Sequence, residues 1–320
     1  MQLNHRAHLI VQGLIEAASV LRVDPTRIGG ATVVDCGVNV AGGLEAGRRM
    51  ARVALAGLAR VQLQHGDPIP GTGLSVCVQT DQPVWACLAS QYAGWPIQED
   101  GYFAMASGPM RLLRGREPLL EVFVRRFQES TAVGVLETGA LPSAQVVRSI
   151  AEACRVQPEQ LVLLVAPTRS IAGTLQIVAR SVETALHKLH EIVSEEELDL
   201  HAVLSASGSA PLPPPAADDL TAIGRTNDAI LYGAQVTLWI DADDSTLRCL
   251  APRLPSSSSP DYGKPFRQIF DEAKGDFYSI DPMLFSPACV RLISVRSGSC
   301  FRAGEPSPRL LTQSFAAAGS

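Results

Sequence analysis

Arg180 and Glu183 stand three residues apart within the segment Arg169–Leu189, and these two side chains could support acid–base chemistry. Residues three apart on a helix are neighbours, so the guanidinium can reach the carboxylate. The spacing alone favours a simpler interpretation, an ion pair on a solvated helix face that contributes little to stability.

The segment around this pair predicts one continuous helix. Its apolar residues recur every three or four positions, as a core-facing helix requires. They are Ile171, Leu175, Val178, Val182, Leu186 and Leu189. The opposite face carries Gln176, Arg180, Glu183 and His187. We therefore expect the pair to lie on the polar side of a long amphipathic helix.

Other catalytic and metal-binding motifs are missing from the sequence. Gly71-Thr72-Gly73 lacks the third glycine of a dinucleotide fingerprint, and the chain has neither a phosphate-binding P-loop nor a G-x-S-x-G elbow. The 7 cysteines are odd in number and form no C-x-x-C, and the 6 histidines form no H-E-x-x-H. We predict no metal and no disulfide framework, with the thiols buried in a protein of the reducing cytoplasm.

Composition indicates a soluble globular protein rather than a disordered chain, a nucleic-acid binder or a membrane protein. The 320 residues are 46 % hydrophobic and 18 % charged, which suits a globular chain. A net charge of −5 argues against general nucleic-acid binding, which normally needs a basic surface. We find no apolar run long enough to span a bilayer and no secretory signal at the N-terminus. We therefore expect a cytoplasmic protein.

Strands and helices alternate along much of the chain, which predicts an α/β fold of mixed α+β layers. We expect strands at 31–35, 74–80, 84–90, 132–137, 161–166, 202–207, 227–232, 235–240 and 285–295, and helices at 4–21, 44–61, 144–154 and 169–189. Residues 91–109 are rich in aromatics and glycine and are expected to form an irregular binding loop. The breaks near Gly139–Ser143 and Pro211–Pro215 mark the boundary poorly; we place an N-terminal domain at 1–140 and a C-terminal domain at 141–320.

Several blocks, taken together and in order, resemble the methenyltetrahydromethanopterin cyclohydrolase family, in its bacterial, methylotroph-type form. The blocks are DCGV at 35–38, TDQPVWACLASQYAGW at 80–95, AMASGP at 104–109, LVAPTRSIAGTLQIVARSVE at 164–183, GRTNDAILYG at 224–233, PSSSSPDYGKPF at 255–266 and IDPMLFSPACV at 280–290. Each block is weak evidence alone, but the combination covers most of the chain. Ser294 departs from the family pattern, in which we expect an asparagine.

The resemblance implies a fold, an activity and an assembly. It implies two α/β domains enclosing the active-site pocket, a homotrimer or another homo-oligomer, and no metal or redox cofactor. The implied reaction is the reversible hydrolysis of 5,10-methenyltetrahydromethanopterin to 5-formyltetrahydromethanopterin, a step of one-carbon metabolism that belongs to formaldehyde oxidation in methylotrophs. The family's functional arginine and glutamate match Arg180 and Glu183.

This reaction needs a base for the attacking water and an acid for the departing N10 nitrogen, and one carboxylate can serve in both steps. Glu183 is the candidate for that carboxylate, and its negative charge also attracts the cationic substrate. Arg180 stays protonated in proteins and is therefore no ordinary acid. Its expected role is to keep Glu183 ionised against burial and to orient the carboxylate or the water.

The remaining blocks supply the predicted substrate-binding residues. These are Tyr92, Trp95, Ser107, Arg225, Asn227, Asp228, Asp261 and Tyr262. Aromatic rings at 92 and 95 could stack on the pterin, with core packing as the alternative. Amide and carboxylate groups at 227 and 228 suit the donor–acceptor edge of a pterin, with an Asx turn as the alternative. Residues 261 and 262 lie in a loop expected to close over the ligand.

Two points stay open at this stage. An anionic tail on the carrier could meet Arg111 or Lys264. A non-catalytic pterin-binding or carrier protein would fit the same resemblance, although retention of both Arg180 and Glu183 argues against it. A cyclohydrolase acting on a tetrahydrofolate carrier is the second alternative, and no single residue separates the two carriers. The expected partner is in every case a small pterin, not a nucleic acid or a membrane.

Overall fold

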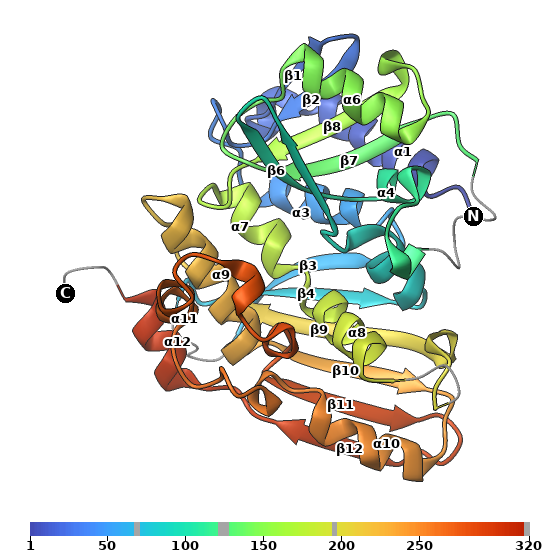
Figure 1. Ribbon diagram of the computed structural model, residues 1–320, viewed down its shortest axis with the longest axis vertical. Helices are drawn as coiled ribbons and strands as arrows, with labels where there is room; N and C mark the ends of the chain where they lie inside the picture. Colours follow the sequence, from blue (N-terminus) through green and yellow to red (C-terminus); the bar gives the residue numbers. More distant parts are fainter. Residues whose placement is uncertain (67–70, 121–127, 194–196, 317–320) are drawn as a thin grey trace. The chain divides into compact units, whose positions relative to one another are not determined.

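The computed structural model describes residues 1–66, 71–120, 128–193 and 197–316 (Figure 1). The chain divides into two compact units, each an α/β layer structure. Unit 1 comprises Met1–Ala59 and Trp85–Ile177, and unit 2 comprises Arg60–Val84 and Val178–Ser320. This division differs from the expected boundary at residue 140, because each unit takes a segment from the other half of the chain.

Unit 1 contains a mixed sheet of six strands. In spatial order they are β1 (Asp24–Ile28), β2 (Ala31–Asp35), β8 (Leu161–Ala166), β7 (Ala132–Glu137), β6 (Tyr102–Ser107) and β5 (Trp95–Glu99). Strands β2, β8 and β7 run parallel, which confirms the three strands expected here. All residues of β8 are buried, as a continuous apolar run predicts for a central parallel strand. Because β8 pairs with both β2 and β7, residues 141–177 belong to unit 1.

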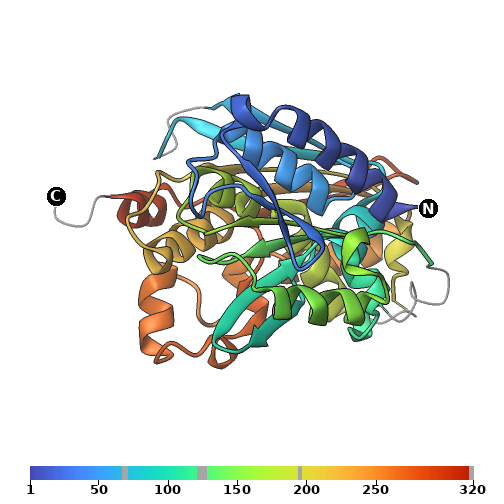
Figure 2. The ribbon, with the colours of Figure 1, turned by 90° about the horizontal axis from the view of Figure 1, so that it is seen from above.

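Helices cover both faces of this sheet. They are α1 (Leu3–Glu16), α2 (Ala18–Leu21), α3 (Leu44–Ala54), α4 (Met110–Arg114), α6 (Ala144–Cys154) and α7 (Ile171–Val178). Figure 2 shows α1 and α3 together on one face and α6 on the other, and a separate apolar core fills each side. The expected helix at 44–61 ends earlier than predicted, at Ala54, because a strand begins at Arg60.

The segment between residues 81 and 109 departs from the sequence expectation. The expected strand at 84–90 is wrong: Val84–Gln91 forms a π-helix, η1. The expected irregular loop at 91–109 is also wrong, since β5 and β6 form a hairpin whose turn, Asp100-Gly101, has positive φ angles at both residues. Residues of η1 are buried almost throughout, so the apolar pattern has no period that distinguishes a helix from a strand.

Arg111 holds η1 in place. Its guanidinium is fully buried and donates to the backbone carbonyls of Leu88 and Ser90 and to the Glu117 carboxylate. The buried cation thus supplies a hydrogen bond to two carbonyls of η1, and the Ser90 carbonyl also accepts the backbone N–H of Gly108.

Unit 2 contains a second sheet of six strands. In spatial order they are β12 (Cys300–Gly304), β11 (Cys289–Ser294), β10 (Gln235–Ile240), β9 (Val203–Pro211), β4 (Leu74–Thr80) and β3 (Arg60–His65). Strands β10 and β11 are parallel, and the other neighbours are antiparallel. The strands expected at 74–80 and 235–240 are confirmed, and those expected at 202–207 and 285–295 correspond to β9 and β11.

The helices of unit 2 are α8 (Ser181–Ile192), α9 (Asp219–Gly233), α10 (Asp244–Leu250), α11 (Phe266–Glu272) and α12 (Pro308–Phe315). Helix α8 lies against β9 and β10 (Figure 1). The strand expected at 227–232 is wrong, because these residues lie inside α9, which begins with Asp218 as its N-cap. Single 3-10 turns occur at 118–120, 158–160, 200–202, 251–253, 256–258, 277–279 and 282–284. None of the described helices combines the length and the apolar character needed to cross a bilayer.

Replacement of Arg111 by Met is expected to destabilise the protein by about 3–5 kcal/mol, because it removes a buried cation and leaves the Glu117 carboxylate buried without its partner. Urea unfolding followed by circular dichroism measures this change. Arg116→Met, at an exposed position of the same segment, is the matched control and should change stability by less than about 0.5 kcal/mol. Equal stability of the two variants would contradict the role given to Arg111.

Candidate active site

The expected helix at 169–189 is two helices, α7 and α8, and the prediction of one continuous helix is wrong. Arg180 is the N-cap of α8, with φ −90° and ψ 9°. The sequence has neither proline nor glycine here, so no local signal predicts a break. The interruption coincides with the passage of the chain from unit 1 to unit 2. The three-residue spacing survives, and it now places Glu183 in the first turn of α8.

The start of α8 docks closely on strand β9 at Gly208. A Cβ atom at this position would lie 2.6 Å from the Ser181 hydroxyl oxygen and 2.8 Å from a methyl group of Val182. Real side chains do not approach so closely, so the glycine is required for the helix to approach the sheet. This contact fixes the first turn of α8, and with it the backbone of the Arg180–Glu183 pair.

Arg180 and Glu183 form an ion pair that is largely buried. The Arg180 Nε and Nη2 atoms each lie 2.9 Å from the same carboxylate oxygen, Oε2 of Glu183. The side chain of Glu183 is only 2 % exposed and that of Arg180 17 %. The expectation drawn from spacing alone, a solvated surface pair, is therefore wrong. A pair removed from water in this way interacts more strongly than one at the surface.

The other carboxylate oxygen of Glu183 is left for a different partner. Among the residues that the structure describes, none donates a hydrogen bond to Oε1. The backbone N–H groups at the N-terminus of α8 and the guanidinium both favour the negative charge. Glu183 is thus an oriented carboxylate with one oxygen anchored and one able to accept a proton, which is the arrangement that general base catalysis requires.

His187 lies one turn further along α8 and was not singled out from the sequence. Burial lowers the pKa of His187, and the negative charges of Glu183 and Glu191 oppose this only in part. The imidazole is therefore neutral at neutral pH and does not compete with Arg180 as a cation beside Glu183.

Lys188, on the same helix, was also missed, because it stands within the apolar run around Leu186 and Leu189. It is 1 % exposed, and its ammonium donates to the Pro255 carbonyl at 2.9 Å, the Ser258 hydroxyl at 2.8 Å and the Met283 carbonyl at 2.6 Å. Burial lowers the pKa of Lys188 to about 8. Through these bonds α8 anchors the loop that precedes Asp261 and Tyr262.

Asp261 and Tyr262 have partners within unit 2. The Asp261 carboxylate accepts the backbone N–H of Asp281 at 2.8 Å, and the Tyr262 ring packs on Tyr232 with 5.1 Å between ring centroids. Both side chains are partly exposed. Their contact with substrate stays a prediction, and the structure adds that they also hold the loop together.

Arg225 and Asn227 lie inside α9 rather than in the polar turn expected before a strand, so that part of the expectation is wrong. The Arg225 guanidinium donates to the backbone carbonyls of Pro214, Pro215, Ser314 and Ala316, and thereby ties two segments to α9. The Asn227 amide donates to the Ile223 carbonyl one turn earlier. These bonds suit a structural role, and binding of substrate by either residue stays a prediction.

Asp228 is the most deeply buried of the predicted binding residues in α9, at 1 % exposure. One carboxyl oxygen accepts the backbone N–H of Phe266 at 2.8 Å. Burial raises the pKa of Asp228 to about 7, although its hydrogen-bond donors, including the Ser314 hydroxyl, lower it in part. The carboxyl group is therefore protonated in mildly acidic solution and links α9 to the start of α11.

Tyr92, Trp95 and Ser107 belong to unit 1. Arginine side chains cover both rings: Arg111 lies 5.0 Å from the centroid of Tyr92, and Arg114 lies 4.5 Å from that of Trp95. Trp95 is 6 % exposed and part of the apolar core, which agrees with the packing alternative. Ser107 is 1 % exposed, and no described residue forms a hydrogen bond with its hydroxyl group.

The two cations considered for an anionic tail differ in accessibility. Arg111 has no exposed surface and is engaged by Glu117, so it does not fit a tail-binding role. The Lys264 side chain is 49 % exposed and forms an ion pair with Glu272 at 2.7 Å. Lys264 is thus the one of the two that solution can reach.

Glu137 and Gln176 were not among the residues predicted from the sequence to bind substrate. Glu137 is the last residue of β7, and its carboxylate accepts a hydrogen bond from the Gln176 amide at 2.9 Å. Glu137 ends an apolar strand, and that position is the one sequence signal that could have identified it.

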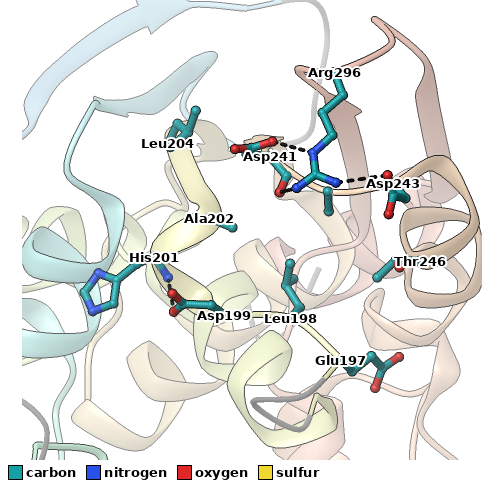
Figure 3. Close-up of a pocket in the computed structure, with 11 residues that line it drawn as sticks. Glu197, Leu198, Asp199, His201, Ala202, Leu204, Asp241, Asp243, Thr246 and Arg296 are labelled. Atoms are coloured by element: carbon teal, nitrogen blue, oxygen red, sulfur yellow. Dashed lines mark hydrogen bonds and ion pairs between the residues drawn. The ribbon is translucent and has the colours of Figure 1, made fainter.

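An open pocket of about 460 Å³ lies elsewhere in unit 2, beyond the C-terminal end of α8 (Figure 3). It contains none of the predicted site residues. Figure 3 shows Arg296 reaching between Asp241 and Asp243, with distances of 2.5 and 2.9 Å. The charges of Arg296, Asp241 and Asp243 are thus paired with one another at the surface. Within the described ranges, no group of three histidine, cysteine, aspartate or glutamate side chains could hold a metal ion.

Comparison with known proteins gives a consistent result over nearly the whole chain. Residues 2–315 match the family described as Cyclohydrolase (MCH). The methenyltetrahydromethanopterin cyclohydrolase of Rhodopirellula baltica is 49 % identical over 98 % of this chain and 94 % of its own. Proteins of the same name from Methylobacterium organophilum and Methanocella arvoryzae are 45 % and 40 % identical, over 96 % and 98 % of this chain and 95 % and 98 % of their own.

Gly208→Ala is expected to destabilise the protein by about 1–3 kcal/mol, because the added methyl group meets Ser181 and Val182 and forces the first turn of α8 away from β9. Thermal and urea unfolding measure the change. Ser209→Ala, whose side chain points to the other face of the same strand, is the control and should be nearly neutral. A neutral Gly208→Ala would show that α8 does not need this close approach.

Asp228→Asn should change how stability depends on pH. The native pKa of Asp228, about 7, lies above its ordinary value of 3.8, so the native state binds more protons than the unfolded state between about pH 4 and 7. The stability contributed by this carboxyl is present below about pH 4 and is lost as the pH rises through 7. The neutral Asn variant is therefore expected to gain stability relative to the wild type over this range, by up to about 4 kcal/mol.

Urea unfolding of both proteins at several pH values between 4 and 8 measures this gain. Asp271→Asn, at a side chain that is 58 % exposed on α11, is the control and should give a nearly constant difference from the wild type. A constant difference for Asp228→Asn would contradict a raised pKa at this site.

Proposed function

The chain belongs to the cyclohydrolase (MCH) family, and we propose that Glu183 is the general base and acid of its reaction. The chain is a hydrolase that opens the cyclic amidine of 5,10-methenyltetrahydromethanopterin, the activity for which its relatives are named. The observation that carries the proposal for Glu183 is the buried Arg180–Glu183 ion pair, which leaves one carboxylate oxygen available at the start of α8.

The chemistry assigns two steps to one carboxylate. The methenyl carbon is electrophilic because it carries the positive charge of the bridge between N5 and N10. Water attacks this carbon while Glu183 accepts one of its protons. The bond between the carbon and N10 then breaks, N10 takes up the proton from Glu183, and the carbon remains on N5 as a formyl group. The second proton of the attacking water is released to solvent as the formyl carbonyl forms, which balances the positive charge of the substrate. Glu183 returns to its ionised form, so the same residue serves the reverse reaction.

Arg180 is a positioning residue in this proposal. Its Nε and Nη2 atoms both contact Oε2 of Glu183, so the guanidinium restricts the direction in which Oε1 points. It also stabilises the charged form of a carboxylate that has little exposure to water. A lysine could supply the charge but not the two donors in one plane.

Three further features belong to the proposal. The reaction changes no oxidation state and the substrate carbon is already activated, which supports catalysis without a metal or redox cofactor. All 7 cysteines are free, which supports a reducing, cytoplasmic location. The family resemblance supports a homotrimer or another homo-oligomer, and relatives from Methylobacterium support a role in formaldehyde oxidation.

Glu183→Gln is expected to lower kcat by at least about 100-fold while substrate still binds, because the amide cannot accept the proton. Arg180→Leu should lose most of the activity through misorientation of the carboxylate. The measurement is the ultraviolet decay of methenyltetrahydromethanopterin, corrected for the rate in buffer alone. Glu191→Gln is the matched control, since this carboxylate lies in the last turn of α8 with its side chain 44 % exposed, and it should retain wild-type kcat.

Different outcomes separate the alternatives. If Glu183→Gln kept more than about a tenth of wild-type turnover, another group would be the base. If the wild type bound the compound without accelerating its hydrolysis, the protein would be a pterin carrier. Faster hydrolysis of methenyltetrahydrofolate than of methenyltetrahydromethanopterin would identify a folate enzyme.

A further inference from the structure

Lys188 is a buried cation that the proposed reaction does not use. It lies on α8, the helix that also carries Glu183, and it is 1 % exposed. Lysine is rarely found at this depth, because its ammonium group loses its hydration there. An apolar side chain would fill the same volume without this loss. We therefore asked what the ammonium group does that an apolar side chain could not do.

The Lys188 ammonium connects α8 to two other segments of unit 2. It donates to the Pro255 carbonyl at 2.9 Å and to the Ser258 hydroxyl at 2.8 Å, both in the serine-rich loop, residues 255–259. Its third bond goes to the Met283 carbonyl at 2.6 Å, in the segment 280–284. An ammonium group has three N–H donors, so all of them are in use.

The same two segments are joined to each other around Asp281. Its carboxylate accepts the Ser259 hydroxyl at 2.6 Å with Oδ2 and the backbone N–H of Met283 at 3.0 Å with Oδ1. The backbone N–H of Asp281 donates in turn to Oδ2 of Asp261 at 2.8 Å. Lys188 thus completes a network of hydrogen bonds that runs from α8 through both segments and reaches Asp261.

This network fixes the loop that carries Asp261 and Tyr262. Both side chains are partly exposed, and Oδ1 of Asp261 accepts no hydrogen bond from the residues that the structure describes. The backbone N–H of Tyr262 donates to the Ser259 carbonyl at 3.3 Å, and its ring packs on Tyr232. The loop therefore presents an oriented carboxylate and a ring to solution, from a backbone that Lys188 ties to α8.

The charge of Lys188 strengthens these bonds, because hydrogen bonds from a cation are stronger than those between neutral groups. Burial lowers the pKa of Lys188 to about 8, and the negative charge of Asp281 opposes this only in part. Strands β9 and β10, on which α8 packs, carry no titratable side chain, and neither does the serine-rich loop. The other titratable side chains of α8 are Glu183, His187, His190 and Glu191.

We propose that Lys188 is a positioning residue for substrate binding, whose ammonium group holds the loop of Asp261 and Tyr262 to the helix that carries Glu183. This inference rests on the function proposed above, because it takes Asp261 and Tyr262 as binding residues for the pterin substrate. Loss of the ammonium group releases the loop but leaves the ion pair of Glu183 at the start of α8, where the helix docks on β9. Binding is therefore weakened, and proton transfer is retained.

Steady-state kinetics of methenyltetrahydromethanopterin hydrolysis test this assignment. Lys188→Met is expected to raise KM by about 10-fold or more with kcat changed by less than about threefold, because binding is lost and the chemical step is not. Lys274→Met, at an exposed lysine of the same unit, is the control and should leave both values within about twofold of the wild type. An unchanged KM in Lys188→Met would overturn the proposal, and so would a loss confined to kcat.

The pH dependence of KM separates this role from simple packing. The neutral amine has two N–H donors and turns a lone pair towards the third acceptor oxygen, so the loop is held less well. Because the pKa of Lys188 is about 8, the KM of the wild type should rise between about pH 7 and 9. Lys274→Met should reproduce this rise, whereas Lys188→Met should show a constant, high KM. A rise of the same size in Lys188→Met would overturn the proposal.

A milder variant keeps the test decisive if Lys188→Met does not fold. Ser258→Ala removes one of the three acceptors and should raise KM by about 2- to 5-fold. Ser257→Ala, at the exposed neighbouring hydroxyl, is the matched control and should leave KM unchanged. Equal KM values for the two serine variants would overturn the proposal.

Hydrogen exchange followed by mass spectrometry gives a readout that does not depend on catalysis. In Lys188→Met, the amides between residues 256 and 264 should exchange about 10-fold faster than in Lys274→Met, because the loop opens more often. Unchanged exchange in this loop would overturn the proposal even in an active enzyme. A wild type that does not hydrolyse methenyltetrahydromethanopterin would overturn the proposed function instead, and the exchange rates would still report whether Lys188 holds the loop.

Discussion

The candidate site in unit 2 depends on one ion pair, which joins the Arg180 guanidinium to a Glu183 carboxylate that is almost removed from water. Glu183 is 1 % exposed, and an isolated charge at that depth would be strongly disfavoured. Arg180 supplies the compensating charge, and the start of α8 supplies the favourable end of a helix dipole. Both depend on where α8 begins, so the start of this helix decides the surroundings of the Glu183 carboxylate.

The placement of α8 depends in turn on features spread along the chain. Gly208 lets the first turn approach β9, and Lys188 ties the middle of the helix to the serine-rich loop and to Met283. Three oxygen acceptors give each N–H group of this buried ammonium a hydrogen-bond partner. The helix that carries the catalytic candidate is therefore held at both its start and its centre by polar or steric contacts of single residues.

The sequence blocks shared with the cyclohydrolase family combine two kinds of residue. Arg225 and Asp228 stand in one block, and the structure engages the Arg225 guanidinium and one carboxyl oxygen of Asp228, Oδ1, with backbone groups of neighbouring segments. Glu183, by contrast, retains an oxygen without a donor among the described residues, and the Ser107 hydroxyl likewise has no partner there. Whether a polar residue completes the fold or awaits a ligand is thus a question about its remaining hydrogen-bonding capacity.

The sequence alone determined the α/β class, the family, several strands and the pairing of Arg180 with Glu183. These follow from local periodicity, apolar runs and short spacing, which depend on neighbours along the chain. Strands β2, β7 and β8 are examples, since nearly all of the buried residues in each strand are apolar.

Only the tertiary structure decided the break before α8, the exchange of segments between the units, the π-helix at Val84–Gln91 and the pairing of Glu137 with Gln176. Each of these arises from contacts between residues far apart in sequence, or from burial on all sides, which removes the periodic signal. The α7–α8 boundary contains no helix-breaking residue, and it coincides with the passage of the chain from unit 1 to unit 2. A sequence records which side chains are present, but their depth and their partners are properties of the folded chain.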